Sequence, residues 1–132
     1  MRKSKGRILY IEDDADTREV ISMVFTVAGF EVLCTDDTDE AVHLARNQRF
    51  DLYMLDNWMP DVPGTQLSQR LRQFDTNTPI LFYSAAAYES DKDAARLSGA
   101  QAYLVKPTSN DEIIAEVARL IAGSQHTTLA AY

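Results

Sequence analysis

Five polar residues stand where short apolar runs of the sequence end: Glu12, Asp13, Asp56, Ser84 and Lys106. Asp56, for example, directly follows the run Leu52–Leu55. Four consecutive apolar residues are typical of a strand that is buried on both faces, where a charge is costly unless it is paired. In a parallel sheet, ligands bind just beyond the carboxyl ends of the strands. These five residues are therefore candidates for one functional site.

The residue types in this group fit phosphoryl chemistry. Neighbouring carboxylates repel one another, and the repulsion can be relieved by a raised pKa, by an ion pair with Lys106, or by a hard cation such as Mg²⁺. The ion pair and the cation can coexist. A carboxylate beside a metal, a hydroxyl and an ammonium can attack phosphorus and form an acyl phosphate. Each residue taken alone also has an ordinary explanation as a helix cap, a turn residue or the end of a strand.

The composition limits the kind of protein. We expect one domain over residues 1–132, with a core at about 7–122, a basic arm at 1–6 and a flexible tail at 123–132. The net charge of −7 argues against nucleic acid as a direct partner. Because no apolar run approaches the roughly 20 residues of a membrane helix, we expect a cytoplasmic protein with no membrane contact. The single cysteine, Cys34, excludes an intrachain disulfide and a cysteine-based zinc site.

Apolar patterns predict five strands that alternate with five helices. The strands are expected at Arg7–Ile11, Phe30–Cys34, Leu52–Leu55, Ile80–Tyr83 and Ala102–Val105. The first helix is expected to start at a capping box formed by Asp16 and Glu19 and to end at Gly29. The other helices are expected at about Asp39–Gln48, Gly64–Phe74, Glu89–Ser98 and Asp111–Ala122. With only Ala94, Ala95 and Leu97 as apolar anchors, the fourth helix should be the least firmly held.

This alternation predicts an α/β fold with a doubly wound, five-stranded parallel sheet of order 2-1-3-4-5, covered by helices on both faces in the flavodoxin-like manner. The switch point of that topology falls between the first and third strands. Glu12, Asp13 and Asp56 would then converge at one edge, with Ser84 and Lys106 beside them.

From Arg7 to about Ile121 the sequence resembles the receiver domain of two-component response regulators. The resemblance rests on four segments that read ILYIEDD, DLYMLDNWMPDVPG, ILFYSA and AYLVKP. It implies that Asp56 accepts a phosphoryl group from a histidine kinase or a histidine phosphotransfer protein in a Mg²⁺-dependent reaction.

The resemblance also implies roles for the neighbouring residues. Glu12, Asp13, Asp56 and the backbone carbonyl of Trp58 would hold Mg²⁺. Ser84 and Lys106 would bind the phosphoryl group, and Tyr103 would move inward as the Ser84 hydroxyl is drawn to it. The sequence departs from the family pattern at Glu12, where Asp is commonest; the longer side chain allows contact with Mg²⁺ through water. Trp58 places a large indole beside Asp56.

The expected function is a phosphorylation-dependent switch that catalyses only its own phosphotransfer and dephosphorylation, and so is not an enzyme acting on other molecules. Its downstream protein target would bind the face formed by the last two helices and the fifth strand, and the chain would be a monomer or a weak dimer. Alternatives are an interaction module that works without phosphorylation and a receiver domain cut from a longer regulator or hybrid kinase. A small phosphatase is disfavoured because Trp58, not a second acid, lies two residues after Asp56.

Overall fold

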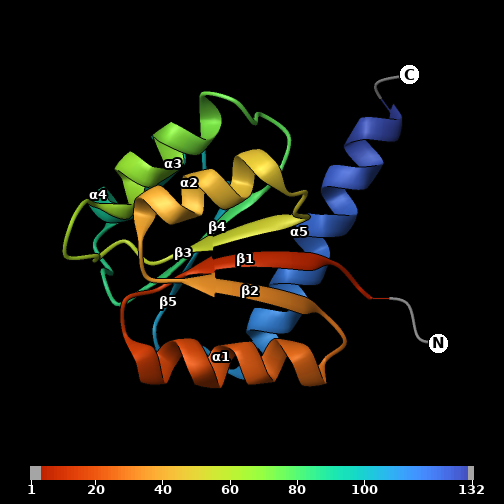
Figure 1. Ribbon diagram of the computed structural model, residues 1–132, viewed down its shortest axis with the longest axis horizontal. Helices are drawn as coiled ribbons and strands as arrows, with labels where there is room; N and C mark the ends of the chain where they lie inside the picture. Colours follow the sequence, from red (N-terminus) through yellow and green to blue (C-terminus); the bar gives the residue numbers. More distant parts are fainter. Residues whose placement is uncertain (1–3, 131–132) are drawn as a thin grey trace.

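The computed structural model describes residues 4–130 of the chain, with side chains through Ser124. These residues form five strands and five helices that alternate along the sequence (Figure 1). The strands are β1 (Arg7–Ile11), β2 (Glu31–Thr35), β3 (Leu52–Leu55), β4 (Ile80–Ser84) and β5 (Ala102–Val105). The helices are α1 (Ala15–Val27), α2 (Thr38–Asn47), α3 (Gly64–Arg72), α4 (Glu89–Leu97) and α5 (Asn110–Ala130).

The strands form one parallel sheet of order β2-β1-β3-β4-β5, which confirms the predicted doubly wound topology. Helices α1 and α5 lie on one face of the sheet, and α2, α3 and α4 lie on the other (Figure 1). Because β1 and β3 are neighbours, the residues that follow them meet at the same edge of the sheet.

Two apolar cores, one on each face, hold the sheet between its helices. Alternate residues of each strand point to opposite faces, so β1 gives Leu9 to the core under α2 and α3 and Tyr10 to the core under α1 and α5. Phe25 of α1 is fully buried in the second core. This two-sided burial explains why β1, β3 and β4 appear in the sequence as continuous apolar runs.

Two local predictions are wrong. The N-cap of α1 is Asp14, whose carboxylate accepts hydrogen bonds from the backbone amide and the hydroxyl of Thr17, so the capping box expected at Asp16 and Glu19 does not form. Leu97, expected as an anchor of α4, is 79% exposed, and Ala95 is the one residue of α4 that is buried. The expectation that α4 buries little apolar surface is confirmed.

The chain ends also differ from expectation. Helix α5 continues through Gly123 to Ala130, so the tail expected from residue 123 is helical over that range (Figure 1). Gly123 does not adopt the positive φ of a helix-ending glycine and therefore does not stop α5. In the expected N-terminal arm, residues 1–3 lie outside the described residues, and Lys5 donates its amide to the Gly29 carbonyl (2.9 Å). Within residues 4–130, none of the helices has the length and apolarity needed to span a bilayer.

Candidate functional site

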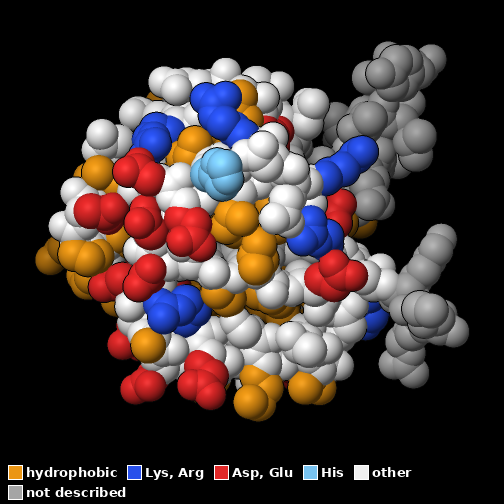
Figure 2. Space-filling view, viewed as in Figure 1, with side chains coloured by type: hydrophobic (Ala, Val, Ile, Leu, Met, Phe, Trp, Pro, Cys, Tyr) orange, Lys and Arg blue, Asp and Glu red, His pale blue; other side chains and the backbone are white. Residues whose placement is uncertain are grey.

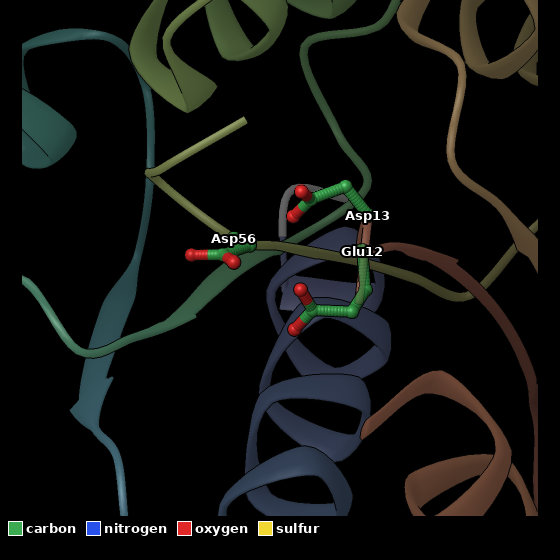
Figure 3. A group of neighbouring side chains, drawn as sticks. All are labelled: Glu12, Asp13 and Asp56. Atoms are coloured by element: carbon green, nitrogen blue, oxygen red, sulfur yellow. The ribbon is translucent and has the colours of Figure 1, made fainter. Parts of the chain in front are cut away.

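Three carboxylates meet where β1 and β3 end. Glu12 and Asp13 follow β1, Asp56 follows β3, and one oxygen from each carboxylate lies within 4.8 Å of the others (Figure 3). The Asp56 amide donates to the Ile11 carbonyl (3.1 Å), which extends the pairing of the two strands into the site. Glu12 and Asp56 are buried, whereas Asp13 is exposed. The predicted convergence of these acids is therefore confirmed.

Lys106 neutralises part of this negative charge. Its ammonium lies 2.6 Å from Oε1 of Glu12 and 3.5 Å from Oδ2 of Asp56. The ring of Tyr83, at the end of β4, lies against the same ammonium, with its centroid 5.4 Å away. The ion pair of Lys106 with the acids, which the sequence suggested, is thus present, and the shorter of its two contacts is with Glu12.

Burial and crowding change the ionisation of this group. Burial raises the pKa of Glu12, and the Asp56 carboxylate adds to the rise, while the Lys106 ammonium opposes both. Burial also disfavours the charge on Lys106, but the Glu12 and Asp56 carboxylates outweigh it and raise the pKa of the ammonium. Lys106 therefore stays charged between the two acids at neutral pH.

The predicted switch residues lie on β4 and β5: Ser84 is the last residue of β4, and Tyr103 is the second residue of β5. Ser84 is fully buried, and its hydroxyl oxygen accepts a hydrogen bond from the Ala86 amide (3.2 Å). Tyr103 stacks on Phe82 and donates its hydroxyl to the Ala86 carbonyl (2.6 Å). Burial raises the pKa of Tyr103, and the side chains of Asn57 and Ser84 oppose that rise. Tyr103 is thus already held to the β4–α4 loop.

The loop after Asp56 carries an exposed indole. The Trp58 amide donates to Oδ1 of Asp56 (3.1 Å), while the Trp58 side chain is 61% exposed. The backbone carbonyl of Trp58 as a metal ligand stays a prediction. This loop and Asp13 line a shallow hollow of about 510 Å³. Acidic side chains gather at this end of the molecule, at the left of Figure 2.

Three residues that contact the acids or Lys106 were not identified from the sequence. Tyr10 donates its hydroxyl to Oε1 of Glu12 (3.1 Å), and Tyr83 lies against Lys106. Arg18 of α1 donates to the backbone carbonyl of Glu12 (2.7 Å). Strand alternation could have indicated Tyr10, because residues two apart on β1 share a face.

The set of donor atoms fits a small hard cation. Carboxylate oxygens are preferred ligands of Mg²⁺, and exposed Asp13 leaves the cluster open to solvent for bound waters and phosphate oxygens. The half-buried ammonium beside the cluster can pair with a phosphoryl oxygen.

Comparison with known proteins identifies the family. The family model of the response regulator receiver domain matches residues 8–118. This chain belongs to that family. The receiver domain shares 39% identity over 111 residues with the uncharacterized transcriptional regulatory protein YrkP of Bacillus subtilis, covering 84% of this chain and 47% of YrkP. It spans about half the length of the curated relatives it matches.

Solved receiver domains have the same architecture. The receiver domain of the Francisella response regulator 1452 matches with a TM-score of 0.84 and 30% identity, covering 90% of this chain and 98% of that one. The receiver domain of the sensor histidine kinase PA1611 from Pseudomonas aeruginosa matches with a TM-score of 0.82 and 27% identity, covering 89% and 98%. The PA1611 structure holds a magnesium ion in its active-site cleft.

Gly64, the first residue of α3, sets the position of the Asp56 loop in this receiver domain. Its amide donates to the Asn57 carbonyl (3.0 Å), and a Cβ added at Gly64 would lie 2.4 Å from the Asp56 carbonyl oxygen. We expect Gly64→Ala to lower the free energy of unfolding by about 1–3 kcal/mol, because the backbone must move to relieve this overlap. Urea unfolding measures the change.

Gly123 provides the matched control for this substitution. A Cβ added there would meet no atom within 4 Å, and the residue lies inside α5. Gly123→Ala should therefore raise stability by up to about 1 kcal/mol, the difference in helix propensity between the two residues. Equal effects of the two substitutions would contradict the role given to Gly64.

Proposed function

We propose that this receiver domain is a phosphorylation-dependent switch whose Asp56 accepts a phosphoryl group from a histidine kinase or histidine phosphotransfer protein in the cytoplasm. The observation that carries the proposal is the grouping of Glu12, Asp13 and Asp56 within 4.8 Å, with Lys106 between Glu12 and Asp56. Membership of the receiver family supports this chemistry, and the acids, Ser84 and Lys106 all stand at strand ends of this chain.

The residues divide the chemistry between them. Glu12, Asp13 and Asp56 would hold Mg²⁺, with the Trp58 carbonyl as a further ligand, and the ion would offset charge on the phosphoryl oxygens. A carboxylate oxygen of Asp56 attacks phosphorus; the new P–O bond forms as the P–N bond to the donor imidazole breaks, and its electron pair returns to that nitrogen. Lys106 and the Ser84 hydroxyl then bind the transferred group.

Phosphorylation would be transmitted through the β4–α4 loop. Ser84, drawn toward the new phosphoryl group, would move the loop whose Ala86 carbonyl holds Tyr103. Helix α4, which follows this loop, is weakly anchored and exposes Leu97 (79%), while Tyr88 just before it is 78% exposed. We propose that a downstream protein binds the α4, β5 and α5 face according to the state of this loop.

Incubation with Mg²⁺ and a small phosphodonor such as acetyl phosphate tests the proposal. Intact-mass spectrometry should show one added phosphoryl group, and EDTA should prevent the addition. A hydroxylamine-sensitive adduct on Asp56, located by peptide mapping, would identify the acyl phosphate. Absence of the adduct with both acetyl phosphate and a panel of phosphorylated histidine kinases would contradict the proposal and favour a phosphorylation-independent interaction module.

A further inference from the structure

Tyr10 lies directly beneath the acid cluster, although nothing in its residue type suggests a role in phosphoryl chemistry. It is completely buried near the carboxyl end of β1, on the face covered by α1 and α5. Glu12 lies two residues later on the same face, and the Tyr10 hydroxyl donates a hydrogen bond to its Oε1 (3.1 Å). The Tyr10 hydroxyl therefore connects the apolar core under α1 and α5 to the candidate metal site.

The Glu12 carboxylate is held at both oxygens. Oε1 accepts from Tyr10 and from the Lys106 ammonium (2.6 Å), and Oε2 accepts from the Asp14 amide (3.3 Å). Glutamate has one more rotatable bond than aspartate, so its carboxylate needs more restraint to present an oxygen at a fixed place. A carboxylate oxygen has two lone-pair sites, and Glu12 can therefore keep these donors and still face a cation.

The two donors to Oε1 of Glu12, Tyr10 and Lys106, differ in whether they can move away from it. Lys106 also contacts Asp56 (3.5 Å) and would bind the phosphoryl group once it is transferred, which withdraws the ammonium from Glu12. Tyr10 cannot turn away in the same manner, because its ring is fixed in the apolar core. Burial, with Glu12 next in importance, strongly raises the pKa of Tyr10, so its hydroxyl remains a protonated donor at physiological pH.

We propose that Tyr10 is a positioning residue for the metal site: its hydroxyl holds the Glu12 carboxylate toward Asp13 and Asp56 and keeps it there when Lys106 turns to the phosphoryl group. The proposal rests on the proposed function, because it assumes that these acids bind Mg²⁺. Tyr10 contacts neither the metal nor the reacting atoms and acts only through Glu12.

Tyr10→Phe tests the proposal because it removes the hydroxyl and leaves the ring. Mg²⁺ binding is measured without any phosphodonor, by calorimetric titration and by the fluorescence of Trp58, the single tryptophan of the chain. We expect the Mg²⁺ dissociation constant to rise about tenfold, the lower end of the range for groups that orient metal ligands. Phosphorylation by acetyl phosphate should then require more Mg²⁺ but reach completion when Mg²⁺ saturates.

Tyr53→Phe is the matched control. Tyr53 is another buried strand tyrosine whose hydroxyl donates to a carboxylate, Oδ2 of Asp75 (2.7 Å), away from the acid cluster. The two variants lose the same kind of hydrogen bond and should show similar decreases in urea midpoint. Only Tyr10→Phe should bind Mg²⁺ more weakly.

A double-mutant cycle separates a positioning role from a general structural one. If Tyr10 acts through Glu12, then Tyr10→Phe should change the Mg²⁺ dissociation constant by less than about twofold in a Glu12→Gln background. An unchanged dissociation constant in the single variant, or an equal loss in both backgrounds, would overturn the inference. Failure of the wild-type chain to bind Mg²⁺ would instead contradict the proposed function.

Discussion

Asp56→Asn should take up no phosphoryl group from acetyl phosphate or from a phosphorylated histidine kinase at any Mg²⁺ concentration. An amide nitrogen and a neutral carbonyl oxygen cannot replace a carboxylate oxygen as nucleophile, and the neighbouring acids do not occupy its place at the end of β3. Intact-mass spectrometry measures the result. The wild-type chain, treated in parallel, should carry one phosphoryl group.

The fold of this variant should remain intact. Asparagine is nearly isosteric with aspartate, and its neutral side chain removes the repulsion between Asp56 and the buried Glu12 carboxylate. Urea unfolding in Mg²⁺-free buffer should therefore show no loss of stability. Asp36→Asn, an exposed position just after β2 at the same edge of the sheet, is the control and should be phosphorylated like the wild type. Phosphorylation that persists in Asp56→Asn would assign the acceptor to another residue.

The meeting of the acids could be predicted because it depends on topology alone. Alternating strands and helices, together with right-handed crossovers, leave few sheet orders, and any order that makes β1 and β3 neighbours brings Glu12 and Asp56 together. The position of Lys106 at the same edge of the sheet could be predicted in the same way, because Lys106 directly follows β5. Residue types at strand ends therefore carried most of the information about the site.

The finer contacts depend on side-chain direction and could not be predicted in the same way. An apolar pattern predicts that the Tyr10 ring is buried, but it does not predict that the Tyr10 hydroxyl donates a hydrogen bond to Glu12. It also does not predict that Lys106 lies closer to Glu12 than to Asp56. Leu97 fits a helical apolar spacing yet is exposed, because α4 meets the sheet mainly through Ala95. Gly123 similarly has the residue type of a helix end without its backbone conformation.

Lys106→Met should lower the free energy of unfolding by about 3 kcal/mol at neutral pH in Mg²⁺-free buffer, since removing the half-buried ammonium leaves the buried Glu12 charge uncompensated. Glu12 is 1% exposed and would keep only its hydrogen bonds from Tyr10 and the Asp14 amide. Methionine retains the unbranched stem, so the loss reflects the ammonium. Urea unfolding measures it, and the variant should also bind the phosphoryl group less firmly.

The pH dependence of this loss follows from Glu12. Its pKa is already raised in the folded chain by burial and Asp56, and removing the opposing Lys106 ammonium raises it further. The folded variant therefore binds a proton on Glu12 more tightly than the unfolded chain does. The contribution of Glu12 to the stability of the variant is therefore greatest below the ordinary glutamate pKa of about 4.3 and falls as pH rises through the raised value. The difference in free energy of unfolding between the wild type and Lys106→Met should be small at acid pH and should grow as Glu12 ionises.

The contribution of Lys106 ends at high pH. Because the Glu12 and Asp56 carboxylates raise its folded pKa above the ordinary lysine value of about 10.4, the stability that Lys106 supplies once these acids are ionised persists up to that pH. It is lost as pH rises through the folded value. Lys92→Met is the control: Lys92 pairs with exposed Glu89 at 3.5 Å, a surface contact worth at most about 1 kcal/mol. A loss in Lys106→Met that is independent of pH would contradict the role given to the ammonium charge.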